Sequence, residues 1–276
     1  MKNYRILIFV LIIAAALALL AGTPPIKPTN QTNPIVIYGD TRTNHNDHRA
    51  VVRAIEQVHP QAVFHTGDLV GDGRVEADWD TFFTITGHLL KTTAFYPTLG
   101  NHEHDSPLYY KHFNLPRSEQ WYSVNIDSIK FIVLNSCTKT DRKSEQYKWL
   151  QKELKDAGAE TKFTVAVFHH PPYSSGPHEE DEKHLRESWG FLFRKYGVDA
   201  VFNGHDHDYE RSKVGDIYYI VAGAGGAPLY SKSRDNPYSQ VFLKEFSFCR
   251  LDRSGDTLKI ETLDTLLNRI DHVEIE

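Results

Sequence analysis

The stretch VFNGHDHDYER, Val201 to Arg211, is an apolar run that ends in a glycine and is followed at once by two histidines. His205 and His207 are two residues apart, with Asp206 between them. In an extended segment, residues i and i+2 point to the same side, so both imidazoles can be aimed at one point or at two adjacent points. A polar turn is the simpler interpretation of this stretch alone. Other segments of the chain are needed to distinguish a turn from a functional site.

Polar side chains also stand at the ends of four other predicted strands. These strand segments are PIVIYGD, AVFHTGD, FYPTLGN and FTVAVFH, and helical patterns separate several of them. Ligands bind beyond the carboxyl ends of strands in open α/β sheets, so the side chains are expected to meet at one rim. Strands and helices alternate early and hairpins dominate late, which predicts an α/β fold with a mixed sheet, or two sheets face to face. The predicted rim residues are Asp40, Asp68, Asn101, His169, His205 and His207.

The donor atoms of this rim suit metal ions. They are two carboxylates, one amide oxygen and three imidazoles, with no thiolate. Oxygen and imidazole donors favour Mn, Fe, Zn and similar ions over Cu(I) or iron–sulfur clusters. This set is too large for one tetrahedral ion and is about right for two ions that share a carboxylate.

The N-terminal end differs from the rest of the chain. Lys2 and Arg5 precede an uncharged apolar run from Ile6 to Ala21. A charged start, an apolar middle and small residues at the end are typical of a secretory signal. As a helix the run would be about 24 Å long, shorter than the roughly 30 Å core of a bilayer, but no A-x-A cleavage site closes it. We therefore predict export, to a secreted, periplasmic or outer-face location, with membrane anchoring as the alternative to cleavage.

The remaining sequence is read as a linker and one large domain. Residues 1–22 form the signal peptide or membrane anchor, residues 23–34 a proline-rich linker, and residues 35–276 the folded domain. A net charge of −5 without a basic face argues against nucleic-acid binding. Cys137 and Cys249 are too few for a disulfide scaffold, and whether they pair is left open.

Five short motifs, in this order along the chain, carry a family resemblance: GDTR, GDLV, GNHE, FHHPPY and GHDHDYER. Together they resemble the calcineurin-like metallophosphoesterases and, within that family, the purple acid phosphatases. The resemblance spans residues 35 to about 230. It implies an αββα sandwich of two mixed β-sheets flanked by helices, and a metallophosphoesterase domain at residues 35–276.

The resemblance also implies a role for each rim residue. Asp40 and His207 would bind a first metal ion, and Asp68 would bridge both ions. The ligands of the second ion would be Asn101, His169 and His205.

Two further histidines fit the resemblance as residues that are not ligands. His102 would contact the phosphate and assist the leaving group. In FHHPPY the first histidine fits the ligand position, because the family places that ligand two residues before a proline and four before an aromatic residue. His170 would then face the substrate or support the ligands from behind.

The sequence departs from the family pattern at the first metal site. The wider family often has a histidine at position 42, where this chain has Arg42. The purple acid phosphatases have a tyrosine ligand at position 71, where this chain has Gly71. Arg42 could bind substrate phosphate with two parallel hydrogen bonds or could pair with a neighbouring acid. Asp72 is a further candidate ligand.

The resemblance implies an acid phosphatase-like hydrolase with two divalent metal ions, Mn, Fe or Zn. A metal-activated hydroxide would hydrolyse small phosphate monoesters. A phosphodiesterase acting on nucleotides or lipid head groups is an alternative, because the loops PHEEDEKHLRES and LYSKSRDNPYSQ would shape the pocket and do not reveal the substrate. A catalytically silent metal-binding or partner-binding module at the cell surface is the alternative from another class.

Overall fold

The computed structural model describes residues 33–116, 120–156, 158, 160–178 and 182–276. The predicted leader at 1–22 and most of the linker at 23–34 lie outside these residues. Within them, no helix is long and apolar enough to cross a membrane.

The first β-sheet of the described chain has the strand order β13-β12-β11-β1-β2-β3. Strands β1, β2 and β3 are parallel to one another, whereas β11 to β13 are antiparallel neighbours. The bounds are β1 (Ile35–Tyr38), β2 (Ala62–His65), β3 (Ala94–Pro97), β11 (Ser247–Ser254), β12 (Thr257–Asp264) and β13 (Arg269–Ile275).

The second β-sheet has the order β10-β8-β9-β7-β6-β5-β4 and is also mixed. Strands β5, β6, β7 and β9 are parallel, and β4, β8 and β10 pair antiparallel with their neighbours. The bounds are β4 (Tyr122–Ile126), β5 (Ile129–Val133), β6 (Phe163–Val167), β7 (Ala200–Asn203), β8 (Tyr209–Val214), β9 (Ile217–Ala222) and β10 (Ser239–Leu243).

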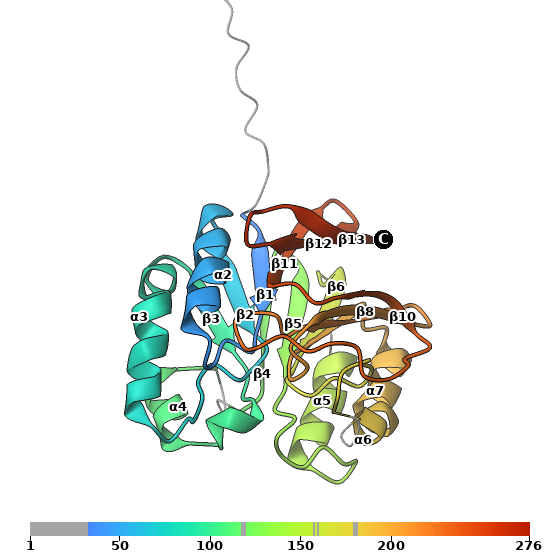
Figure 1. The fold of residues 1–276 in the computed structure, drawn as a ribbon. Helices are drawn as coiled ribbons and strands as arrows, with labels where there is room; N and C mark the ends of the chain where they lie inside the picture. The colour runs from blue at the N-terminus through green and yellow to red at the C-terminus, as the bar shows by residue number, and fades with distance from the viewer. Residues whose placement is uncertain (1–32, 117–119, 157, 159, 179–181) are drawn as a thin grey trace, which may run out of the picture. The chain divides into compact units, whose positions relative to one another are not determined.

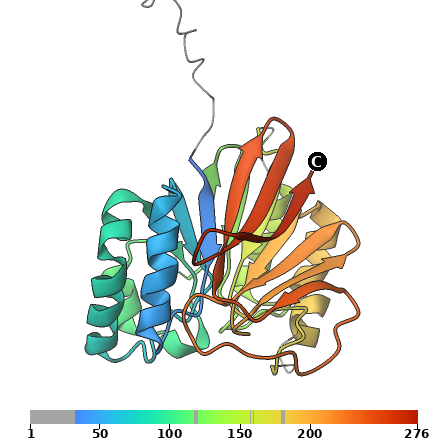
Figure 2. The same cartoon turned by 45° about the horizontal axis from the view of Figure 1, so that its top comes forward.

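The two sheets pack face to face, with helices on their outer faces (Figures 1 and 2). Phe64 of β2 stacks on Phe131 of β5 with ring centroids 4.2 Å apart, so the inner faces are in direct contact. Helices α2 and α3 cover one outer face, and α5 and α7 cover the other. The helices are α2 (His45–Gln57), α3 (Glu76–Thr92), α4 (Pro107–His112), α5 (Glu145–Lys155), α6 (Glu182–Glu187), α7 (Trp189–Tyr196) and the short 3₁₀ helix η1 (Asn101–Glu103).

This architecture confirms the predicted αββα sandwich with two mixed sheets. The apolar strands are buried on both faces, because each sheet lies between the other sheet and a layer of helices. Cys137 and Cys249 are not joined by a disulfide, which answers the question that the sequence left open.

His48, on the inner side of α2, makes the stability of this domain pH-dependent. It is 1% exposed, and its Nε2 atom has no hydrogen-bond partner among the described residues. Burial lowers its pKa to about 3, with smaller contributions from His45 and Arg49. The unfolded chain binds this proton more readily than the folded one, so stability is fully present above about pH 6.5 and is lost as the pH falls towards 3.

We therefore expect the free energy of unfolding to fall by about 2 kcal/mol between pH 7 and pH 5 through His48 alone. His48→Phe should lose less stability over this interval than the wild type, as measured by urea unfolding at both pH values. His184, which is exposed, offers the matched control. His184→Phe should keep the wild-type pH dependence, and a His48→Phe variant that keeps it too would contradict the assignment.

Candidate metal centre

The strand ends bring the predicted rim residues into one cluster. Asp40 follows β1, Asp68 follows β2 and Asn101 follows β3. His169 follows β6, and the histidine pair of the opening stretch follows β7. Two groups of three residues have potential ligand atoms that lie within 4.8 Å of one another inside the group. One group is Asp40, Asp68 and His169, and the other is His169, His170 and His205. The convergence is a property of the structure, while the individual ligand roles stay predictions.

Three residues of the cluster have a left-handed backbone conformation. The φ angle is 56° at Asp40, 56° at Asp68 and 70° at His205. Such conformations cost roughly 1–3 kcal/mol each and are concentrated at functional sites. The Asp40 carboxylate accepts a hydrogen bond from the His205 backbone N–H at 2.9 Å, which joins the two sheets. Gly204 permits this approach, because a Cβ atom there would lie 2.2 Å from an Asp40 oxygen.

The buried carboxylate of Glu103 fixes the loops that carry two of the cluster residues. Its Oε2 accepts from the backbone N–H of Asp68 at 2.9 Å and of Gly100 at 2.7 Å, and its Oε1 accepts from Leu69 at 2.9 Å. Burial, followed by the charge of Asp68, raises the pKa of Glu103 to about 8, against the effect of these N–H groups. The turn after β2 and the turn after β3, which presents Asn101, are therefore held together by one side chain.

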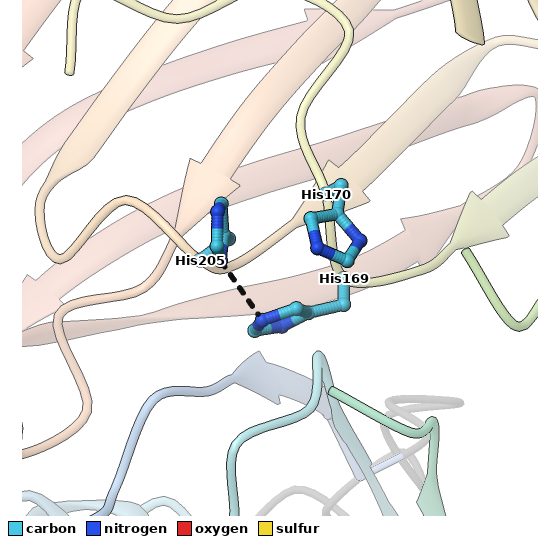
Figure 3. A group of neighbouring side chains, drawn as sticks. All are labelled: His169, His170 and His205. Carbon is cyan, nitrogen blue, oxygen red and sulfur yellow. Dashed lines mark hydrogen bonds between the residues drawn. The ribbon is translucent and has the colours of Figure 1, made fainter. Parts of the chain in front are cut away.

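Three potential ligand atoms surround Nε2 of His169, and Figure 3 shows the one that belongs to His205. Nδ1 of His169 lies 2.9 Å from the Thr66 carbonyl oxygen and donates to it, so the lone pair of the neutral ring is on Nε2. This Nε2 lies 3.0 Å from Oδ1 of Asn101 and 3.3 Å from Oδ1 of Asp68, which are both acceptors. Nδ1 of His205 lies 3.1 Å from the same Asn101 oxygen and 3.2 Å from Nε2 of His169.

These distances fit a bound cation. Acceptors that face one another repel, and a cation between them removes the repulsion. Ligands about 2.1 Å from an ion in tetrahedral or octahedral geometry lie about 3.0–3.4 Å from their neighbours. The observed separations of 3.0 to 3.3 Å agree with that range. The donor atoms of Asn101, His169 and His205, which together with the neighbouring Asp68 form the second donor set, therefore suit a divalent ion of the Mn, Fe or Zn type.

The first donor set, which consists of Asp40, Asp68 and His207, has different surroundings. Nδ1 of His207 donates to the Pro228 carbonyl oxygen at 3.0 Å, so its lone pair is also on Nε2. This atom lies 3.6 Å from Asp40, and Nη2 of Arg42 donates to it at 3.3 Å. Nε of Arg42 donates to Oδ2 of Asp68 at 3.2 Å. Arg42 therefore forms an ion pair with a neighbouring acid, and its contact with substrate phosphate stays a prediction.

Burial controls the charge of the cluster. It raises the pKa of Asp40 well above its usual range, and the charge of Asp68 raises it further. It also lowers the pKa of His169 and of His205 well below the usual range, and that of His207 to about 4. The imidazoles are therefore neutral near pH 7, which is the form that binds metal ions. The buried carboxylates carry a desolvation cost that a bound cation would offset.

His102 lies beside Asp68, the residue predicted to bridge the two ions. Its Nδ1 donates to the Gly71 carbonyl oxygen at 2.6 Å, and its Nε2 lies 3.8 Å from Oδ2 of Asp68. The side chain is 29% exposed, so a ligand can reach it. Gly71, the position at which the resemblance expects a tyrosine, here orients His102 through its backbone carbonyl.

The remaining predicted residues divide into one that joins the cluster and one that does not. The ring of His170 lies 4.5 Å from that of His205 between centroids, and its Nδ1 lies 2.8 Å from the Ser136 hydroxyl. The Asp72 carboxylate pairs with the exposed guanidinium of Arg74 at 2.7 Å. Among the described residues, Asp72 belongs to neither group of potential ligand atoms.

Two residues at the centre have no role in the sequence prediction. The ring of His178 lies 4.2 Å from that of His205, and its Nδ1 lies 2.7 Å from the buried Asp206 carboxylate. Tyr230 stacks on His207 with centroids 4.2 Å apart and planes 18° apart. Both come from the two loops that were expected to shape the pocket, but loop composition does not reveal which side chain folds inward.

Comparison with protein families agrees with this geometry. A family model described as "Calcineurin-like phosphoesterase" matches residues 33–209. The chain belongs to the calcineurin-like phosphoesterase family.

Purple acid phosphatases are among the relatives of the chain. "Probable purple acid phosphatase 20" of Arabidopsis thaliana is 34% identical over 212 residues, which are 66% of this chain and 49% of that protein. "Fe(3+)-Zn(2+) purple acid phosphatase 12" of the same plant is 33% identical over 196 residues, 63% of this chain and 42% of that protein. The chain spans about half the length of the first of these curated relatives.

Solved structures share the fold. The purple acid phosphatase PPD1 from yellow lupin (Lupinus luteus) seeds has a TM-score of 0.80 at 21% identity, over 88% of this chain and 53% of that one. GAP50, described as the anchor in the inner membrane complex of Plasmodium, has a TM-score of 0.73 at 16% identity, over 88% of both chains. At these identities the likeness supports the fold alone.

Proposed function

We propose that the chain is an exported, metal-dependent phosphoesterase that hydrolyses phosphate monoesters with an activated water molecule. The observation that carries the proposal is the convergence of potential ligand atoms described above, which suits a divalent ion at the carboxyl ends of the strands. Family membership and the acid phosphatase relatives support the reaction class. The donor atoms belong to Asp68, Asn101, His169 and His205.

The proposed centre takes divalent ions such as Mn, Fe or Zn. The six predicted donors are enough in number for two ions, and the reaction requires at least the ion of the second donor set. A divalent ion in this position would neutralise phosphoryl oxygens and lower the pKa of bound water towards about 7. Gly71 offers no phenol group, so the first set of Asp40, Asp68 and His207 carries too little negative charge to favour a trivalent ion.

The surrounding side chains would position the ester. Nε2 of His102 points at the cluster because Nδ1 donates to Gly71, and in the doubly protonated ring this Nε2 would carry the proton that the departing oxygen needs. Arg42 would contribute positive charge beside the phosphoryl group. His170 and His178 border the second donor set and would orient the phosphate oxygens.

The substrate class can be tested with a nitrophenyl phosphate monoester and the matching bis-ester. The full chain, freed of metal by a chelator, should be inactive and should regain turnover of the monoester with Mn, Fe or Zn. Asp68→Ala should stay inactive, whereas Asp216→Ala, at an exposed turn, should behave as the wild type. Faster turnover of the bis-ester would favour the phosphodiesterase, and no turnover of either ester with any metal would favour the silent surface module.

His102→Ala should slow hydrolysis of esters with poor leaving groups by about 10²-fold or more, because the departing oxygen loses its proton donor. The loss should shrink for esters with good leaving groups, which need little protonation. Turnover numbers for both ester types, with the metal content counted in parallel, provide the measurement, and exposed His184→Ala is the control. Equal losses for both ester types would instead assign His102 to substrate binding.

Export is proposed from the charged start and the apolar run of residues 1–22. A reporter fused after Pro34 should be found outside the cytoplasm, and the same fusion without residues 1–22 should remain inside. Sequencing the N-terminus of the exported product distinguishes cleavage from anchoring. Retention of the first fusion in the cytoplasm would exclude export.

A further inference from the structure

The two donor sets of the metal centre differ in what their lone pairs face. In the second set, Nε2 of His169 faces the oxygens of Asp68 and Asn101, which are acceptors as well; of these, Oδ1 of Asp68 also accepts from the backbone N–H of His102 at 3.0 Å. In the first set, each acceptor faces an N–H group of the protein. Nε2 of His207 and Oδ2 of Asp68 accept from Arg42.

The contact with His207 excludes a metal ion from the same nitrogen. A neutral imidazole has one unprotonated nitrogen with one lone pair in the ring plane. Nδ1 of His207 is protonated, because it donates to the Pro228 carbonyl oxygen at 3.0 Å. The only lone pair is therefore on Nε2, and it accepts from Nη2 of Arg42 at 3.3 Å. An ion could bind His207 only after Arg42 had moved away.

The backbone holds Arg42 at this position. The N–H of Thr41 donates to the carbonyl oxygen of Asp68 at 3.0 Å, and the Thr41 hydroxyl donates to the carbonyl oxygen of Leu69 at 3.0 Å. The side chain of Arg42 is 17% exposed and lies against a 1% exposed Asp68 carboxylate. Tyr230 stacks on one face of the His207 ring. This contact also limits the movement of the His207 ring, whose Nε2 accepts from Arg42.

We propose that the guanidinium of Arg42 takes the place of the first cation, so that the chain binds one divalent ion and not two. The ion would be held by Asp68, Asn101, His169 and His205. The guanidinium is permanently charged and carries five N–H donors in a fixed plane, of which two are directed at Asp68 and His207. It can therefore supply both positive charge and hydrogen bonds to a phosphoryl group. The inference rests on the proposed function only for the existence of a metal centre.

The number of ions per chain tests the inference without any substrate. The full chain is stripped with a chelator, saturated with Zn or Mn, freed of excess metal and analysed by mass spectrometry of the metal. The wild type should hold one ion per chain, and Arg42→Ala should hold two. The affinity of Arg42→Ala for a second ion should be at least about tenfold higher than the affinity of the wild type for a second ion. Arg74→Ala, which removes an exposed guanidinium from the same region, should still hold one.

Variants of the two histidines locate the ion. In the wild-type background, His205→Ala should lose the ion and His207→Ala should keep it. In the Arg42→Ala background, His207→Ala should return the count from two to one. With Mn, the electron paramagnetic resonance spectrum of the wild type should be that of isolated ions, and that of Arg42→Ala should show coupling between two.

Two ions in the wild type would overturn the inference, whatever happens in the variants. One ion in a folded Arg42→Ala would overturn it too, because the guanidinium would then not be what excludes the second ion. Arg42→Met, which keeps the apolar stem, serves if Arg42→Ala does not fold. A chain with one ion that hydrolyses no ester would support this inference and contradict the proposed function, so the two failures are distinguishable.

Discussion

The metal centre depends on one buried carboxylate that satisfies the loops around it. Glu103 accepts hydrogen bonds from four backbone N–H groups, at Asp68, Leu69, Val70 and Gly100. A buried N–H group without a partner costs about 1–3 kcal/mol, so these turns could not keep their conformations without this acceptor. The turns that carry Asp68 and Asn101 lie close together because both donate backbone hydrogen bonds to the same side chain.

The second constraint is the contact between the sheets. One half of the donor set follows strands of the first sheet and the other half follows strands of the second. Packing such as Phe64 on Phe131 brings the sheets together, and the hydrogen bond from the His205 backbone to Asp40 fixes their ends. The site is therefore assembled by the same apolar burial that stabilises the sandwich. The left-handed conformations of Asp40, Asp68 and His205 are retained because this packing and these hydrogen bonds hold them.

Much of the fold could be predicted from local patterns. Apolar runs that end in a polar residue predicted the strands of both sheets, and the order of the motifs carried the family resemblance. The partners of Arg42 could not be predicted in this way, because Asp68 and His207 are distant from it in sequence and meet it only through strand pairing and sheet packing. His178 and Tyr230 escaped prediction for the same reason. They lie on polar loops whose composition is the same whether a side chain faces solvent or the centre.

The sequence by itself determined which residues are candidate donors and that they stand at strand ends, because both follow from residue type and from the apolar runs along the chain. The order of the motifs, through the family resemblance, also indicated the family. Only the tertiary structure decided which lone pairs face each other and which face an N–H group. That distinction depends on distances between residues such as His207 and Arg42, which are far apart in the chain and are brought within 3.3 Å only when the two sheets pack.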